Sequence, residues 1–337
     1  MARIPGGTFT MGTDAPGVSG DGEAPARRVC VSSFHIGATE VSVAQWAAFA
    51  RASGHATDAE RFGWSFVFEG HATELANVAS SQSVAAAPWW IRVDGADWRH
   101  PRGPDSDALA PGDPGGEPGG MREHPVVHVS WHDAHAFCAA AFPGGRLPTE
   151  AEWERAAGRG APLGGGGGGG GGDTREFPWG DKLVPAGGGH CANVWQGRFP
   201  HADQGADGYN GSAPVTAFGV QNEYGLYNMV GNVWEWVSDA WTTQHTAGAI
   251  IRDPQGPALP AAALAAERWR EAERVKKGGS FLCHRSYCFR YRIPARTSST
   301  ADSSTSNLGF RCVRPLGTEE AAAEVEAGDV CANGNSE

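Results

Sequence analysis

The sequence predicts a loop-rich fold that mixes short strands with short helices. Gly (49) and Pro (22) together make up about a fifth of the 337 residues, against a usual share of about 12%. Thirteen Trp residues supply much of the bulk of a core, and each strand or helix signal covers only a few residues. The length permits two domains, but no break in composition divides the folded part, so one large domain is equally compatible with the sequence.

Short strands are expected where apolar residues alternate between turn residues. Gly6–Gly12 alternates around Phe9 and is bounded by glycines, which is typical of a strand. Arg28–Ser32 and Phe34–Ile36 form a second strand region, and Val126–Trp131 is a further candidate.

Three helices are predicted at residues 42–54, 130–141 and 149–158. Each begins with a capping box, in which the N-cap residue and the third helical residue bond each other's backbone. Trp46 in the first helix and Cys138 in the second lie on apolar faces at helical spacing, so both should point into the core.

The remaining chain divides into irregular segments. Residues 62–120 lose all periodicity but carry several Trp residues, which favours an ordered loop region. The nine glycines at 164–172 predict a flexible surface loop, and 261–273 is the strongest helix former. Residues 316–337 are acidic and aperiodic, which predicts a disordered tail after a folded domain at 1–315.

Charge and hydropathy exclude some classes of partner. The formal net charge of −11 argues against a nucleic-acid surface, which requires a concentrated basic face. No apolar run approaches the ~18 residues of a membrane span, and the N-terminus shows no apolar signal segment. We therefore expect a soluble, cytoplasmic protein without nucleic-acid or membrane partners.

Cys283 and Cys288 lie in the most informative stretch, Lys276–Arg292, which carries six cationic or potentially cationic residues. Nearby positive charge favours the thiolate and lowers the pKa of a thiol. The spacing fits neither a Cys-x-x-Cys redox site nor a four-ligand zinc site. Two thiolates suit Cu(I), a soft ion of low coordination number, while a local disulfide or two unrelated core thiols remain open.

A series of motifs carries a resemblance to a known family. The motifs occur in the order Gly6–Gly12, His124–Trp131, Arg146–Glu154, Phe177–Gly180, Asn228–Trp236 and Asn307–Cys312. Together they resemble the formylglycine-generating enzymes, also called sulfatase-modifying factors, and the resemblance spans about Gly6 to Arg314. It implies a single compact α+β domain with little regular secondary structure, a variant of the C-type lectin-like fold, and we expect a monomer.

The resemblance also implies an activity. The family converts the cysteine of a Cys-x-Pro-x-Arg segment in an unfolded sulfatase polypeptide to Cα-formylglycine, with O2 as co-substrate and an external thiol as reductant. Cu(I) would be held by Cys283 and Cys288, and the substrate thiolate would add a third soft ligand. Ser280 would be catalytic, and further residues would line the pocket or hold the peptide: Trp234, Tyr287, Arg296 and Asn307. Simple packing remains the alternative for each of these.

Two calcium sites are implied in the same way. The first combines the side chains of Asn193 and Asp207 with the carbonyls of Val194 and Tyr209. The second combines the side chains of Asn228 and Glu235 with the carbonyls of Gly231 and Val233. All these donors are hard oxygens, as Ca²⁺ prefers, although the residues alone would indicate ordinary Asx turns.

Other Cys and His residues receive structural interpretations. By resemblance, Cys138 and Cys312 match a family disulfide, whereas Ala157 and Ile293 replace the partners of a second one. The residues without an assigned role are Cys30, Cys191 and Cys331. A trio of histidines would suit an iron site only with an additional helical domain, so surface or strand-end positions are expected for His128, His132 and His135.

Two functions compete at this stage. The leading hypothesis is a copper-dependent oxidase, because the Cys283–Cys288 pair is intact and catalytically silent members of the family lack it. The alternative is a silent lectin-like binding module or partner of sulfatases. A structural or regulatory disulfide between the two cysteines, without a metal, is a third possibility.

Overall fold

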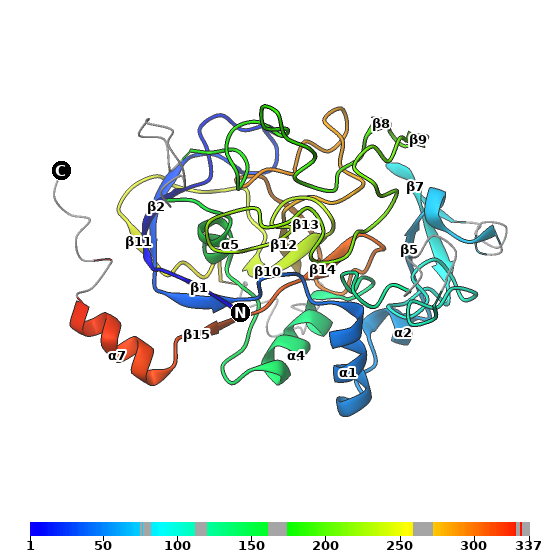
Figure 1. Cartoon of the computed structure of the whole chain (residues 1–337), viewed down its shortest axis with the longest axis horizontal. Helices are drawn as coiled ribbons and strands as arrows, with labels where there is room; N and C mark the ends of the chain where they lie inside the picture. Colours follow the sequence, from blue (N-terminus) through cyan, green and yellow to red (C-terminus); the bar gives the residue numbers. More distant parts are fainter. Residues whose placement is uncertain are drawn as a thin grey trace.

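The computed structural model describes residues 1–74, 76, 82–111, 120–160, 174–258, 272–327 and 331 (Figure 1). The predicted glycine loop at 164–172 lies outside the described residues. The predicted helix at 261–273 also lies outside them, except for its last two residues, and Glu273 begins a strand.

A four-stranded sheet lies at the centre of the molecule (Figure 1). Its order is β13 (Thr297–Thr300), β12 (Glu273–Lys277), β10 (Trp234–Ala240) and β14 (Leu308–Phe310). β12 pairs antiparallel with both neighbours, while β10 and β14 run parallel. The sheet therefore joins three of the motifs that are far apart in sequence.

Smaller sheets surround this centre. They are β1 (Ala2–Ile4), β4 (Phe34–Ile36) and β15 (Val313–Pro315); β11 (Ile251–Arg252), β3 (Arg27–Val31) and β2 (Gly7–Met11); β5 (Trp64–Phe68), β7 (Ala87–Asp94) and β6 (Ser83–Val84); and the pair β8 (Gly197–Arg198) and β9 (Ala202–Asp203). The predicted strands near the N-terminus are confirmed as β2, β3 and β4.

The strand prediction at Val126–Trp131 is wrong. This segment lies outside the strands, and the Val126 amide donates to the Val41 carbonyl at 2.9 Å as an isolated contact. Ser130 instead caps the following helix through its side chain. Neighbouring apolar residues are buried here by tertiary packing rather than by a β-ladder, which is why the local pattern misled the prediction.

All three predicted capping boxes are present in the structure. The helices are α1 (Val43–Ser53), α2 (Asp58–Phe62), α4 (Trp131–Ala141), α5 (Glu150–Ala156) and α7 (Thr318–Ala327), with a 3₁₀ turn η1 (Glu69–His71). The predicted core residues Trp46 and Cys138 are both fully buried. No helix within the described ranges is long and apolar enough to cross a membrane.

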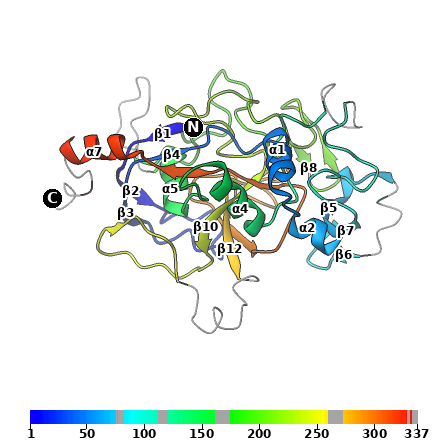
Figure 2. The ribbon, with the colours of Figure 1, turned by 90° about the horizontal axis from the view of Figure 1, so that it is seen from below.

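The tail predicted as disordered contains helix α7, so that prediction is wrong for Thr318–Ala327. Figure 2 shows this helix beside β1 and β4. Glu320 bonds His35 on β4 at 3.1 Å, and Glu324 pairs with Arg3 on β1. Local Ala and Glu residues favour a helix, and these tertiary contacts hold it against the sheet. An aperiodic composition does not reveal such contacts.

A disulfide joins Cys331 to Cys30 on β3. A second disulfide joins Cys138 on α4 to Cys312, which confirms the pairing implied by the resemblance. Cys191 is a free thiol.

Candidate active site

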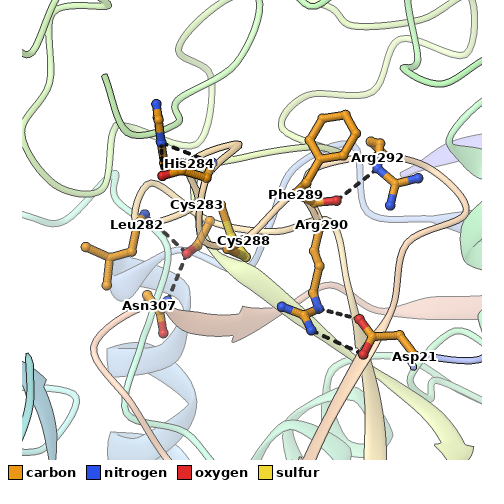
Figure 3. The surroundings of a disulfide bond; sticks show 11 residues. Asp21, Leu282, Cys283, His284, Cys288, Phe289, Arg290, Arg292 and Asn307 are labelled. Carbon is orange, nitrogen blue, oxygen red and sulfur yellow. Dashed lines mark hydrogen bonds and ion pairs between the residues drawn. A yellow bond between two sulfur atoms is a disulfide. The ribbon is translucent and has the colours of Figure 1, made fainter. Parts of the chain in front are cut away.

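Cys283 and Cys288 lie in a tight loop that follows β12, and their sulfur atoms are bonded to each other (Figure 3). The Cys283 amide donates to the Ser280 carbonyl at 2.8 Å, and the Cys288 amide donates to the His284 carbonyl at 2.7 Å. These two backbone hydrogen bonds fold the loop back on itself. Both cysteines are therefore brought together by local turns, with a Cα–Cα distance of 4.8 Å.

The Ser280 hydroxyl is held by two donors, drawn as dashed lines in Figure 3. Asn307 Nδ2 donates to Ser280 Oγ at 2.8 Å, and the Leu282 amide donates at 3.3 Å. Thr305 Oγ1 in turn donates to Asn307 Oδ1 at 2.8 Å, which fixes the orientation of the Asn307 amide. Because Ser280 Oγ accepts both bonds, its own proton is available for donation.

A cleft of about 290 Å³ contains the cysteine pair. The structure brings six of the predicted site residues into its wall: Cys283, Cys288, Ser280, Trp234, Tyr287 and Asn307. These residues come from β10, the loop after β12 and the segment before β14. The central sheet thus assembles a site from three separate motifs.

The sequence analysis missed an aromatic wall of this cleft. Trp89, Trp90 and Phe199 line it together with Tyr287. The Tyr287 ring stacks on Phe199 with 4.4 Å between centroids and meets Trp89 edge to face at 4.7 Å. The unusual density of Trp in the irregular region was the available signal, but it gave no indication of which rings reach the cysteine pair.

Cations also line the cleft. Arg290 forms a two-pronged ion pair with Asp21. Lys276 Nζ lies 5.5 Å from the centre of the Trp234 ring. Burial, followed by the positive charge of Arg290, lowers the pKa of Lys276 to about 8. The sequence analysis counted both residues among the local cations but assigned neither a role.

Arg296 does not lie in this cleft, so its predicted role in the pocket is not supported by its position. It lines a separate cavity of about 240 Å³, where its guanidinium donates to both oxygens of Glu150 at 2.8 Å. Its Nη1 also contacts Nε2 of His245 at 2.9 Å. This buried ion pair ties the segment before β13 to α5, which is a structural role.

The first predicted calcium set is partly assembled. The Val194 carbonyl and Asp207 Oδ2 both accept from Gln196 Nε2, at 2.6 and 2.7 Å, so these oxygens converge on one point. The Tyr209 amide donates to Asp207 Oδ1 at 3.0 Å. Asn193 instead directs Nδ2 to the Gly211 carbonyl at 2.7 Å. Converging hard oxygens beside a carboxylate fit Ca²⁺.

The second set does not fit a calcium site as predicted. Both oxygens of Glu235 are bound by the Arg311 guanidinium, at 2.6 and 2.7 Å, so the carboxylate is already neutralised. Asn228 donates to Glu40 at 3.2 Å, and its Oδ1 is buried without a hydrogen-bond partner. Gly231 and Val233 lie in the connecting loop between them. The sequence could not reveal that Arg311 reaches this carboxylate.

His128 is fully buried, which corrects the expectation of a surface or strand-end position. Its Nδ1 bonds Ser65 Oγ at 2.8 Å and its Nε2 bonds the Pro101 carbonyl at 2.9 Å. Burial lowers its pKa to about 4, so the ring is neutral. His135 stacks on Trp131 in α4, with 5.1 Å between centroids.

Comparisons with known proteins agree with this arrangement. The model of the sulfatase-modifying factor enzyme 1-like domain matches residues 1–316. The formylglycine-generating enzyme of Bos taurus is 52% identical over 312 residues, 93% of this chain and 74% of that protein. The inactive Cα-formylglycine-generating enzyme 2 of Bos taurus is 39% identical over 322 residues, 94% of this chain and 88% of that protein. The solved structure of PvdO from Pseudomonas aeruginosa shares the fold, with a TM-score of 0.55, 19% identity and 93% coverage of both chains. This chain therefore belongs to the family of sulfatase-modifying factors, the formylglycine-generating enzymes.

Proposed function

We propose that this protein oxidises the cysteine of a Cys-x-Pro-x-Arg segment in an unfolded sulfatase polypeptide to Cα-formylglycine, with O2 as acceptor. The observation that carries the proposal is the Cys283–Cys288 pair, which lies beside Ser280, Trp234 and Asn307 in one cleft. Membership of a family that contains a formylglycine-generating enzyme at 52% identity supports it.

The donor set of the cleft fits Cu(I). Once the bond between them is reduced, Cys283 and Cys288 present two soft thiolates at a Cα–Cα distance of 4.8 Å, a set that suits this ion and few other first-row metals. The two cysteines would hold the ion, which would supply an electron-rich centre for reaction with O2.

The other cleft residues would bind and orient the peptide. The aromatic wall formed by Trp89, Phe199 and Tyr287 covers the sulfur atoms and excludes water. Burial raises the pKa of Tyr287, so its phenol remains protonated and can donate a hydrogen bond. Ser280, fixed by Asn307, can donate its proton to an anionic group in the cleft.

The overall reaction balances with one external dithiol equivalent. The substrate Cβ loses two electrons as the thiol carbon becomes an aldehyde, and two molecules of a thiol reductant supply two more as they form a disulfide. One O2 accepts these four electrons; one of its oxygen atoms leaves as water. The aldehyde oxygen can come from water when the sulfur departs as sulfide, a step that returns a second water to the balance.

The test is mass spectrometry of a Cys-x-Pro-x-Arg peptide incubated with the reduced protein, Cu(I), O2 and a thiol. We expect conversion of the peptide cysteine to an aldehyde, trapped as a hydrazone. A peptide with Ser in place of Cys and a protein with the Cys283→Ser substitution serve as controls. Binding of the cysteine peptide without conversion would instead support the silent binding module, a function represented in the family by an inactive relative.

A dithiol–disulfide function without a metal is the second candidate, and the bond between Cys283 and Cys288 is the observation that favours it. In that case a Cu(I)-specific chelator would leave turnover unchanged. We further propose Ca²⁺ at the Val194 and Asp207 oxygens, and a monomer located in the cytoplasm. Size-exclusion chromatography with light scattering checks the oligomeric state.

A further inference from the structure

Lys276 is a cleft residue that the proposed reaction leaves without a role. It lies on β12, lines the cleft with Cys283 and Cys288, and is only partly buried. We propose that Lys276 forms an anion subsite that balances the negative charge of the sulfur ligands and selects a thiolate substrate. This inference rests on the proposed function and specifies how the cleft recognises the reacting group.

The surroundings of Lys276 differ from those of neighbouring cations. Arg290 is neutralised by Asp21. Lys277, the next residue on the strand, points to the other face of the sheet, where its Nζ donates to Glu150 at 3.3 Å and to Glu154 at 2.9 Å. In the part of the chain that the structure describes, Lys276 forms no ion pair.

An unpaired ammonium in such a place is unfavourable in the free protein. Burial and the nearby Arg290 charge lower the pKa of Lys276 to about 8, which still leaves most of the side chain protonated at neutral pH. A partly desolvated charge is stabilised when an opposite charge approaches it. The contact with the Trp234 ring, at 5.5 Å, holds the ammonium near the cleft but does not neutralise it.

The proposed ligands supply the missing negative charge. Two thiolates around one Cu(I) carry one net negative charge, and a substrate thiolate adds a second. All of them share a cleft of about 290 Å³ with Lys276, where low polarity strengthens the attraction. The Arg of the Cys-x-Pro-x-Arg motif is a cation and would be repelled from Lys276. The subsite therefore favours the thiolate end of the motif at this wall.

The test compares Lys276→Met, which removes the charge at similar length, with Lys276→Arg, which retains it. Lys182→Met is the matched control, because Lys182 is exposed and outside the cleft. Cu(I) affinity is measured on reduced protein without peptide, by competition with a chromogenic Cu(I) chelator. We expect Lys276→Met to weaken Cu(I) binding about tenfold, and Lys276→Arg and Lys182→Met to leave it within about threefold of wild type.

Peptide kinetics and binding provide a second readout. Lys276→Met should lower kcat/KM for the cysteine peptide by more than tenfold, whereas its affinity for a peptide with Ser in place of Cys should stay unchanged. Equal melting temperatures establish that the variants fold. The inference is overturned if Lys276→Met retains wild-type Cu(I) affinity and kcat/KM, or if Lys276→Arg fails to restore them. A wild-type protein that binds no Cu(I) would instead refute the copper assignment and this inference with it.

Discussion

At the scale of single residues, the proposed chemistry depends on the sulfur atoms of Cys283 and Cys288. Either Cys→Ser substitution should abolish formylglycine formation, because one thiolate cannot hold Cu(I) in a two-coordinate site and a serine oxygen is too hard to replace it. The fold should survive, since backbone hydrogen bonds from the loop itself hold the segment. Melting temperatures measured in reductant and aldehyde detection in the peptide check both parts. Substantial turnover by either variant would contradict the two-thiolate site.

Asp239, in the second cavity, gives a residue-scale prediction about pH. Burial, followed by the negative charge of Glu150, raises the pKa of Asp239 from 3.8 to about 7. The folded protein keeps this proton between these pKa values while the unfolded chain has lost it. The contribution of Asp239 to stability is therefore complete below about pH 4 and is lost as the pH rises through about 7.

Asp239→Asn should remove this loss, because the amide stays neutral and its oxygen can still accept from the Glu150 amide. Relative to wild type, we expect the variant to gain about 2 kcal/mol in the free energy of unfolding between pH 5 and pH 8. Urea unfolding at both pH values measures it. Asp94→Asn is the control, since that side chain is 80% exposed. Parallel pH profiles of wild type and Asp239→Asn would show that the raised pKa is wrong.

At the scale of elements, loops rather than helices or strands form the functional surfaces. The loop containing Val194 and Asp207 collects oxygens around one point, and we predict that Ca²⁺ binds there as a structural ion. A calcium chelator should lower the melting temperature of the wild type and have little effect on Asp207→Asn, which already lacks the charge.

Asp203→Asn provides the matched control for this loop. Asp203 accepts backbone bonds from Gln196 and Gly205 in the same segment but is outside the proposed ligand set. Its variant should keep the response to the chelator. If the chelator leaves the wild-type melting temperature unchanged and no calcium copurifies, the loop is stabilised by its hydrogen bonds alone.

At the scale of the whole molecule, the Cys30–Cys331 disulfide closes almost the entire chain, with a sequence separation of 301. Cys30→Ser should lower stability by about 2–4 kcal/mol, because the unfolded chain regains the entropy of a long closed loop. Thermal unfolding without reductant measures the change, and Cys191→Ser, at the free thiol, is the control. Equal losses from both variants would mean that the bond does not constrain the chain.

The same bonds bear on the cytoplasmic location, which remains a prediction. Disulfides persist mainly in oxidising compartments, whereas the sequence analysis placed the chain in a reducing one. Protein made in an oxidising compartment should show one titratable thiol when denatured without reductant, from Cys191. Counting thiols in protein recovered from its natural compartment determines which redox environment applies.

The sequence by itself determined the elements and motifs that depend on neighbours along the chain. Capping at Ser42, Ser130 and Thr149 is local hydrogen bonding, so the three helix starts could be read directly. The Cys283–Cys288 loop is likewise closed by bonds within a few residues. The resemblance added the remaining expectations for the site and the disulfide at Cys138.

Only the tertiary structure decided which distant groups meet. It moved Arg296 from the cleft to the Glu150 ion pair, paired Glu235 with Arg311, and brought Trp89 and Phe199 to the cysteine pair. These contacts join residues separated by up to about two hundred positions, and local propensity contains no information about them. The physical reason is that burial and charge pairing are settled by the whole packed core, after the short elements have been placed.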